Sequence, residues 1–409
     1  MTAAPMHLDH LLVGGRVLTC AEPAGAPLVV HDDLVLGVAG GRLAYVGVGV
    51  PATAGPTPVV DLGGRLVTPG LVDCHTHAIF AGDRAAEFAL RAAGASYLDI
   101  AAAGGGIAAT TTPTRAASDD QLAASCTARL DRALAGGTTT IEIKSGYDLT
   151  CAGEERLLRV VAAVAAARRG RQQVVPTLLC HLIPAERQAD RAAYVDELAT
   201  VLVPAVGRAG LATSIDVYCD QGAFTRAETE RLLRAGLAAG LAVRAHVGQF
   251  ADLGGAELVA GLGGWSIDHV EQIGPAGIAA AAAAGTVAVM LPGACVQLRL
   301  PVPPVAALRA AGVAMAVASD LNPGSSYCET LPVQMWLATT HYGLTVDEAW
   351  RGVTCHAARA LGLRDVGVIA TGARADLCVW DAVHPAEVPY RYGAQAPAQV
   401  WVAGARVAG

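Results

Sequence analysis

The chain has 409 residues, of which 53% are hydrophobic, and a formal net charge of −7 at pH 7. This length suits one large domain with an accessory domain, and the apolar content is enough for a large core. The acidic balance gives nucleic-acid binding no electrostatic support, so we expect no nucleic-acid partner.

Residues 1–15 contain no basic segment followed by an apolar one, so they do not resemble a secretory signal. The ten cysteines form no CxxC pair, which is typical of buried thiols in a reducing compartment. The charge-free stretch 272–298 is rich in Ala and Gly and predicts a helix and a buried strand rather than a membrane span. We therefore expect a cytoplasmic protein without membrane association.

Both ends of the chain show short apolar runs that Gly and Pro interrupt. Residues 29–60 alternate and turn too often for helices, and residues 370–409 repeat this style, with no helix expected. The sequence predicts a small β-sandwich domain built from residues 1–64 and 364–409, around a central domain of residues 65–363.

In the central domain, apolar β runs alternate with helical runs rich in Ala, Leu and Arg, which indicates βα repeats. The first strand leads into LVDCHTH at residues 71–77. Seven more are predicted at residues 138–145, 174–181, 215–219, 242–247, 266–270, 287–291 and 314–320. Eight strands suit an α/β fold of the (β/α)8 TIM-barrel type, and a doubly wound sheet is the alternative.

Polar residues at the strand ends favour the barrel. One lies at or just after the C-terminal end of each of six strands: His77, Lys144, His181, His246, His269 and Asp320. Barrel enzymes gather their catalytic groups at this end. A doubly wound sheet usually carries a Gly-rich loop directly after a strand, whereas GGG at residues 104–106 follows none.

His75 and His77 are two apart in a predicted strand, so their imidazoles point to the same face. An HxH pair also occurs on loops that bind no metal, but Asp73 and the later strand-end residues favour a metal site. His246 and Asp320 complete a set of three neutral nitrogens and one carboxylate. This set suits one Zn(II) or Fe(II) ion per chain and leaves a place for water.

A metal of this kind lowers the pKa of a bound water and polarises a carbonyl, so hydrolysis is the predicted reaction class. Asp320, beside that water, could act as ligand and general base together. His269 could donate a hydrogen bond to the developing oxyanion. The plainer alternatives are an aspartate that caps a turn and a structural histidine.

Lys144 is the only lysine in the chain, which suggests that its position needs a compact ammonium. It is either a carboxylated lysine that bridges two metals or, as we favour, a member of a buried ion pair with Glu142 or Asp73. Among other polar residues, Arg84 could bind a substrate carboxylate, and Tyr97 and Tyr147 could donate hydroxyl groups.

The chain contains several long motifs: PGLVDCHTH from residue 69, FAGDRAAEF from 80, TTTIEIKSGYDL from 138, DHVE from 268, SDLNPGSS from 319 and HPAEVPYRYG from 384. On these motifs the chain resembles the imidazolonepropionase family of the amidohydrolase superfamily, over nearly its whole length. The resemblance implies a barrel with a small β domain, zinc or iron, a homodimer and a role in histidine degradation.

The resemblance also implies roles for single residues. The metal ligands would be His75, His77, His246 and Asp320. The residues that hold the substrate ring and its propionate would be Arg84, Tyr147, His181 and Gln249, the last also with a catalytic role. Asn322, Gly324 and Ser325 match a loop that contacts the product, and the lysine at position 144 is not a metal bridge in the family.

Three departures from the family pattern are expected to affect specificity rather than hydrolysis. They are Val247 with Gly248, residues 180–184 and residues 328–332. We expect hydrolysis of 4-imidazolone-5-propanoate to N-formimidoyl-L-glutamate, with Arg84 and Tyr147 binding the propionate. The alternatives are a paralogue that acts on a related imidazolone, hydantoin or other nitrogen heterocycle, including a deaminase, and a non-catalytic scaffold.

Overall fold

A computed structural model describes residues 5–23, 25–94, 105–393 and 395–409. Eight parallel strands form the central sheet, and each pairs with the next in the chain. They are β8 (Leu71–Asp73), β9 (Thr138–Lys144), β10 (Gln173–Cys180), β11 (Ser214–Tyr218), β12 (Ala242–His246), β13 (Ser266–Asp268), β14 (Val287–Met290) and β15 (Met315–Val317). All eight coincide with predicted strands.

The first and last strands of this sheet meet just beyond their C-terminal ends. The backbone N–H of Asp320 donates to the carbonyl of His75 at 3.0 Å, and that of His77 donates to Leu321 at 2.8 Å. A parallel bridge joins Thr76 to Leu321. The sheet is therefore a nearly closed barrel, which confirms the predicted TIM-barrel fold and excludes the doubly wound alternative.

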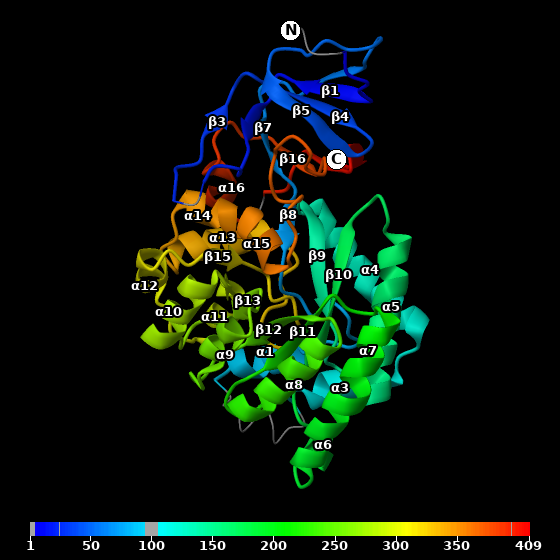
Figure 1. The fold of residues 1–409 in the computed structure, drawn as a ribbon, viewed down its shortest axis with the longest axis vertical. Coiled ribbons are helices and arrows are strands. Elements are labelled where there is room, and N and C mark those ends of the chain that lie inside the picture. The colour runs from blue at the N-terminus through cyan, green and yellow to red at the C-terminus, as the bar shows by residue number, and fades with distance from the viewer. Residues whose placement is uncertain (1–4, 24, 95–104, 394) are drawn as a thin grey trace.

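Helices follow the strands and cover the barrel (Figure 1). Three begin with a capping box, at Ser118, Thr225 and Thr345; this motif satisfies N–H groups that have no partner within the helix. The helices are α1 (Ala85–Ala92), α3 (Ala108–Ala116), α4 (Asp119–Ala135), α5 (Cys151–Ala167), η1 (Ala185–Arg187), α6 (Arg191–Glu197), η2 (Leu198–Leu202), α7 (Val203–Ala209), α8 (Arg226–Ala238), α9 (Gly255–Gly261), α10 (Pro275–Ala284), α11 (Pro292–Leu298), α12 (Val305–Ala310), α13 (Leu331–Thr340), α14 (Val346–Gly352) and α15 (Cys355–Ala360).

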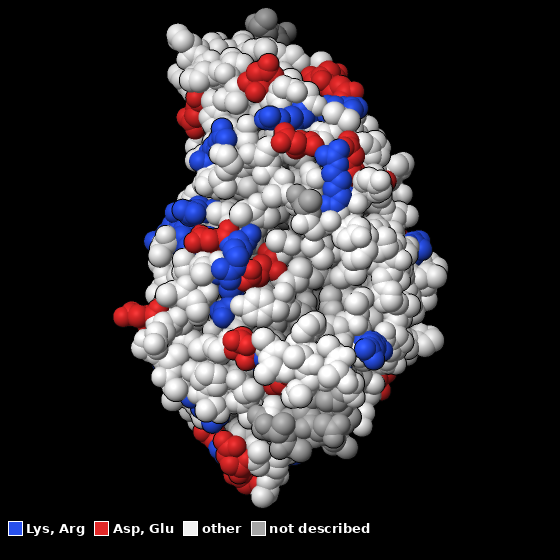
Figure 2. Space-filling view, turned by 180° about the vertical axis from the view of Figure 1, so that it is seen from behind, with Lys and Arg blue, Asp and Glu red and all other residues white. Residues whose placement is uncertain are grey.

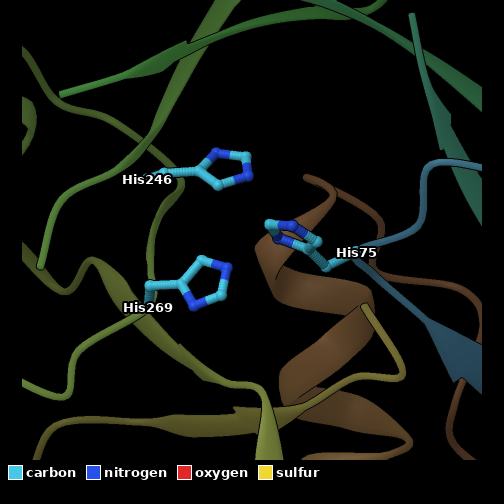
Figure 3. Close-up of side chains that lie close together, drawn as sticks. All are labelled: His75, His246 and His269. Atoms are coloured by element: carbon cyan, nitrogen blue, oxygen red, sulfur yellow. The ribbon is translucent and has the colours of Figure 1, made fainter. Parts of the chain in front are cut away.

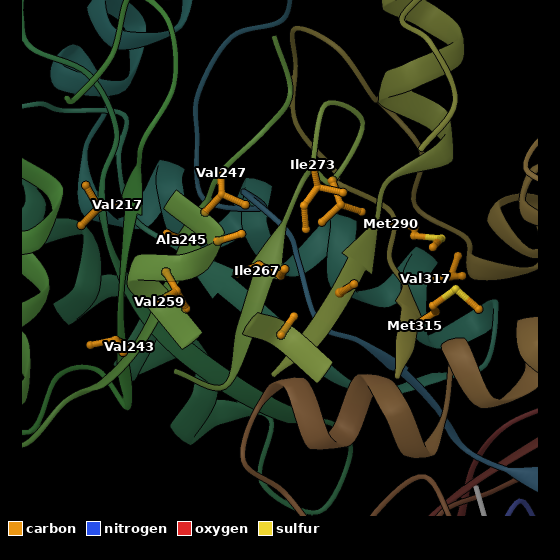
Figure 4. Close-up of a cluster of buried hydrophobic side chains, with 14 of the residues drawn as sticks. Val217, Val243, Ala245, Val247, Val259, Ile267, Ile273, Met290, Met315 and Val317 are labelled. Atoms are coloured by element: carbon orange, nitrogen blue, oxygen red, sulfur yellow. The ribbon is translucent and has the colours of Figure 1, made fainter. Parts of the chain in front are cut away.

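The barrel strands alternate in what they bury. Val243, Ala245 and Ile267 belong to an apolar cluster that also contains Val259 of α9 (Figure 4). The residues between them, such as Arg244, belong to a buried hydrogen-bonded polar network. Successive side chains of a strand point to opposite faces, so the same strands supply both the apolar core and the polar interior of the barrel.

Two smaller sheets lie at one end of the molecule (Figure 1). One has the order β5-β4-β1-β6, and the other has the order β18-β17-β16-β7-β2-β3. Their strands are β1 (His10–Val13), β2 (Arg16–Leu18), β3 (Val30–His31), β4 (Leu34–Ala39), β5 (Arg42–Val48), β6 (Val59–Asp61), β7 (Leu66–Pro69), β16 (Leu377–Trp380), β17 (Gln399–Val402) and β18 (Ala405–Ala408). Both chain ends thus contribute, as predicted.

One apolar cluster joins the two small sheets, with members such as Leu36, Val67 and Leu377. Strand β7 lies in the stretch assigned from the sequence to the barrel domain, yet it pairs with β16 and β2. The next strand, β8, starts the barrel, and Gly70 separates the two. Gly70 is packed so closely that an added Cβ would lie 2.2 Å from Thr139 Oγ1, so only glycine fits this junction.

The C-terminal segment contains a short helix, α16 (Glu387–Tyr390), where the sequence predicted none. The carboxylate of Glu387 accepts hydrogen bonds from the N–H groups of Val383 and His384, both at 3.0 Å, which fixes the segment that leads into the helix. In the stretch 272–298, α10 and β14 confirm the predicted helix and buried strand. Of the helices in the described part of the chain, none has both the length and the apolar character needed to cross a membrane.

Candidate metal and substrate site

The four predicted metal ligands meet at the C-terminal end of the barrel. His75 and His77 follow β8, His246 ends β12, and Asp320 follows β15. Asp320 Oδ1 lies 3.5 Å from His75 Nε2 and 3.4 Å from His77 Nε2. The ring centroids of His75 and His246 are 4.6 Å apart. Figure 3 shows the rings of His75, His246 and His269 around a common space.

Two buried aspartates fix the histidine rings. Asp268 Oδ2 lies 2.6 Å from His75 Nδ1, and Asp216 Oδ1 lies 2.8 Å from His246 Nδ1. A hydrogen bond from each Nδ1 leaves Nε2 as the lone-pair nitrogen of the neutral ring. Burial lowers the pKa of both histidines, so neutral rings are favoured.

These donor atoms fit a metal ion. His75, His77 and Asp320 offer ligand atoms within 4.8 Å of one another, as do His75, His246 and His269. His75 Nε2 and His77 Nδ1 are buried without a hydrogen-bond partner among the described residues. Burial opposes ionisation of Asp320, but a hydrogen bond from His77 and the nearby His269 outweigh it and lower its pKa. Neutral imidazoles beside a carboxylate are a ligand set that Zn(II) and Fe(II) accept.

His269 lies on the other side of Asp320. Its Nε2 is 3.8 Å from Asp320 Oδ2, and its Nδ1 is 3.6 Å from Glu271 Oε1. Burial alone would lower the pKa of His269, but the charge of Glu271 outweighs it and raises that pKa. Both His269 (φ 57°) and Asp320 (φ 50°) have left-handed backbone conformations, which are rare for residues other than Gly and often occur at functional sites.

Lys144 forms ion pairs with Glu142 and Asp216 at 2.8 and 2.7 Å. The favoured prediction of a buried ion pair therefore agrees with the structure, with Glu142 rather than Asp73 as a partner. The Nζ of Lys144 is thus in direct contact with both carboxylates.

Arg84 lies against the loop that follows Asp320. An added Cβ on Gly324 would lie 2.3 Å from Arg84 Nη1, so the guanidinium covers this glycine. Arg84 Nη2 donates to Glu87 Oε2 at 2.5 Å, whereas its Nε is buried without a partner among the described residues. A donor in this state is available to a ligand.

Asn322 orders the loop from Asp320 to Ser325. Its Oδ1 accepts from the N–H groups of Gly324 and Ser325 at 2.8 and 2.7 Å, and its Nδ2 donates to the carbonyl of Asp320 at 2.7 Å. Ser325 Oγ lies 3.5 Å from Asp320 Oδ2. These three predicted residues are therefore brought together around Asp320.

Tyr147 and His181 lie beside the metal-ligand histidines. Their ring centroids are 5.5 Å apart, and each lies within 6 Å of His77, at 5.9 and 5.7 Å. His181 Nδ1 bonds the carbonyl of Gly146 at 2.9 Å, and burial lowers the pKa of His181 to about 3. Gln249 is linked to His181 through Tyr218: its Oε1 accepts a hydrogen bond from Tyr218 Oη at 2.6 Å, and the rings of Tyr218 and His181 are 5.8 Å apart. Tyr97 lies outside the described residues.

Two of the three departures from the family pattern have local structural explanations. Val247 belongs to the apolar core, and an added Cβ on Gly248 would lie 3.2 Å from the carbonyl of His269. In residues 328–332, Glu329 pairs with Arg132 of α4 at 2.6 Å. These contacts are with the apolar core, the backbone of His269 and helix α4, and the expected effect on specificity stays a prediction.

Sequence reasoning missed the carboxylates that support the site. Asp216 and Asp268 orient histidines, Glu271 faces His269, and Glu154 and Asp220 accept backbone N–H groups of the loops that carry Tyr147 and Gln249. A signal was present in two of them, since Asp216 and Asp268 are acids inside apolar strands. Such an acid is buried only with a partner.

The sequence profile of the Amidohydrolase family matches residues 100–408. The chain is 47% identical over 382 residues to an imidazolonepropionase of Cereibacter sphaeroides, which covers 92% of this chain and 95% of that protein. It is 46% identical over 395 residues to an imidazolonepropionase of Caulobacter vibrioides, and this match covers 95% of this chain and 97% of that protein.

Solved structures share the fold at low sequence identity. N-isopropylammelide isopropylaminohydrolase of Burkholderia multivorans matches with a TM-score of 0.69 and 22% identity, over 98% of both chains. A 5-methylcytosine deaminase of Klebsiella pneumoniae matches with a TM-score of 0.73 and 15% identity, over 97% of both chains. From the family profile and the extent of the sequence identity, the chain belongs to the amidohydrolase family and, within it, to the imidazolonepropionases.

Proposed function

We propose that the chain hydrolyses the ring amide of 4-imidazolone-5-propanoate to N-formimidoyl-L-glutamate in histidine degradation. Water adds across the C–N bond, so the carbonyl carbon gains the hydroxyl and the ring nitrogen gains the proton. The observation that carries the proposal is the convergence of His75, His77, His246 and Asp320 at the C-terminal end of the barrel, in a chain 46–48% identical to imidazolonepropionases.

We propose that one Zn(II) or Fe(II) ion per chain is held by these four residues. When bound, such an ion lowers the pKa of water and polarises a carbonyl. Asp216 and Asp268 hold two of the rings in the tautomer that ligation needs. The burial of all four side chains excludes bulk solvent from their donor atoms.

Asp320 is the proposed general base. Its pKa is lowered, so it is anionic and can accept the proton of the attacking water and deliver it to the leaving ring nitrogen. His269, whose Nε2 is 3.8 Å from Asp320 Oδ2, is placed to donate to the oxyanion that forms on the ring carbonyl. Ser325 lies 3.5 Å from the same Asp320 oxygen and helps to orient it.

The substrate carboxylate is assigned to Arg84. Its buried, unpartnered Nε supports this role, because a carboxylate there would satisfy the donor. We assign Tyr147, His181 and Gln249 to the substrate ring, and the loop of Asn322, Gly324 and Ser325 to its other side. The ring contact of Tyr147 with His181 and the order of the loop support this assignment. Tyr97, a homodimer and a cytoplasmic location stay predictions from the sequence.

The test is the loss of imidazolonepropionate absorbance on adding metal-loaded protein. Asp320→Asn should lower kcat by at least about a thousandfold, because it removes both base and ligand. Asp33→Asn, a change of an exposed carboxylate, should leave the rate unaltered. Ammonia release would instead identify a deaminase, and no substrate loss from protein that holds one metal per chain would indicate another cyclic amide such as a hydantoin.

A further inference from the structure

Lys144 lies in a cluster of buried charges beneath the candidate metal site. Its Nζ is 2.8 Å from Glu142 Oε1, 2.7 Å from Asp216 Oδ2 and 3.7 Å from Asp268 Oδ2. All four side chains are completely buried, and they come from three strands, β9, β11 and β13. Lys144 thus links three acids that water does not reach.

Two of these acids are the ones that orient metal-ligand histidines. Asp216 accepts from His246 Nδ1 and also lies 3.2 Å from the backbone nitrogen of His246. Asp268 accepts from His75 Nδ1. A carboxylate orients an imidazole only while it is fixed in place, and a buried carboxylate needs a compensating cation to stay there.

Arg244 is a second cation in the same cluster, but it contacts only two of the three acids. It donates to Glu142 through Nη1 and to Asp268 through Nη2, the latter at 2.9 Å. Within the described residues, Lys144 is the one Lys or Arg that forms an ion pair with Asp216. Asp268 therefore has a second cation in direct contact, whereas Arg244 acts on Asp216 only at longer range.

We propose that Lys144 is a positioning residue that sets metal affinity by holding Asp216 against His246. Asp216 uses one carboxylate oxygen for Lys144 and the other for His246, so the lysine controls the angle at which the acid meets the ring. The ammonium is a compact charge that meets both Glu142 and Asp216, whereas a guanidinium is larger and planar. The inference rests on the metal site of the proposed function.

The experiment measures Zn²⁺ affinity of the metal-free protein by competition with a chromophoric chelator. Lys144→Met and Asp216→Asn should each weaken binding by about 10- to 100-fold. The Zn²⁺ affinity of the double variant should be within about threefold of that of the single variant that binds Zn²⁺ more weakly, because both changes remove the same support. Thermal unfolding in the presence of chelator checks separately that each metal-free variant is folded.

Wild-type affinity in Lys144→Met overturns the inference, as does a double variant whose loss equals the product of the two single losses. If Lys144→Met does not fold, Glu142→Gln is compared with Glu142→Gln/Lys144→Met, since that double change removes one buried charge of each sign. Equal affinities of that pair would likewise overturn it. A wild-type chain that binds no Zn²⁺ would contradict the proposed metal site itself, which is a separate result.

Discussion

At the scale of single residues, the contact between Arg84 and Gly324 gives the proposed carboxylate site a sharp test. Gly324 has no positive φ, so its backbone accepts alanine, but the added Cβ would lie 2.3 Å from Arg84 Nη1. Because this atom is the tip of a flexible side chain, Gly324→Ala should displace the guanidinium and leave the fold intact.

We expect Arg84→Ala to raise KM by about 10- to 100-fold with a smaller change in kcat, since a charge-assisted hydrogen bond contributes about 1.5–3 kcal/mol. Gly324→Ala should raise KM in the same direction, and the double variant should be no worse than Arg84→Ala. Steady-state kinetics provides the measurement. Gly261→Ala, where a Cβ meets nothing within 4 Å, is the control. An unchanged KM in Arg84→Ala would refute the assigned role.

At the scale of an element, the N-terminal turn of α5 positions the loop that carries Tyr147. Glu154 accepts from the N–H groups of Gly146, Asp148 and Leu149 at 2.5, 2.8 and 2.7 Å. Its side chain is buried, so water cannot easily replace it. The same loop presents the Gly146 carbonyl to His181. One carboxylate therefore holds two candidate substrate residues in place.

Glu154→Ala should destabilise the protein by about 3 kcal/mol, because three buried N–H groups lose their acceptor. It should also raise KM, because Tyr147 and His181 lose their support. Urea unfolding and steady-state kinetics measure the two effects. Glu155→Ala, the adjacent change on α5, removes only a surface pair with Arg159 and should cost about 0.5 kcal/mol or less. Equal stabilities of the two variants would contradict this account.

At the scale of the whole molecule, stability should depend on His356, which joins α15 to β15. Its Nδ1 bonds the carbonyl of Met315 at 3.0 Å, and burial lowers its pKa from 6.5 to about 4. The unfolded chain therefore binds a proton that the folded chain does not between these values. The contribution of His356 to stability is complete above pH 6.5 and is lost as the pH falls toward 4.

Between pH 7 and pH 5, this group should remove about 1–2 kcal/mol of unfolding free energy. His356→Asn keeps a donor for Met315 but has no group that is protonated in this range. The fall in its unfolding free energy from pH 7 to pH 5 should therefore be smaller than that of the wild type by about 1–2 kcal/mol. Urea unfolding of the metal-free protein at both pH values measures the difference. The same substitution at the exposed His341 serves as the control, and equal losses in wild type and His356→Asn would count against the prediction.

The sequence by itself determined the eight barrel strands, the sheets from both chain ends, and the residues that converge at the strand ends. These features follow from local periodicity, and parallel strands bring their C-terminal ends to one edge whatever the details of packing. The long motifs around His75, Lys144 and Asp320 also identified the family. The strands could be located from the spacing of glycines and the alternation of apolar residues, without tertiary information.

Tertiary structure alone decided which acids support the site. Nothing in the sequence pairs Asp216 with His246 or Asp268 with His75. The first contact depends on the register of the neighbouring strands β11 and β12, and the second joins the end of β8 to β13, two strands that are not neighbours in the sheet. The partners of Lys144 could not be predicted fully for the same reason. The sequence suggested Glu142 or Asp73, whereas in the structure the partners are Glu142 and Asp216. The helix at Glu387 escaped prediction because it has only four residues, whereas hydrophobic periodicity becomes visible only over several turns.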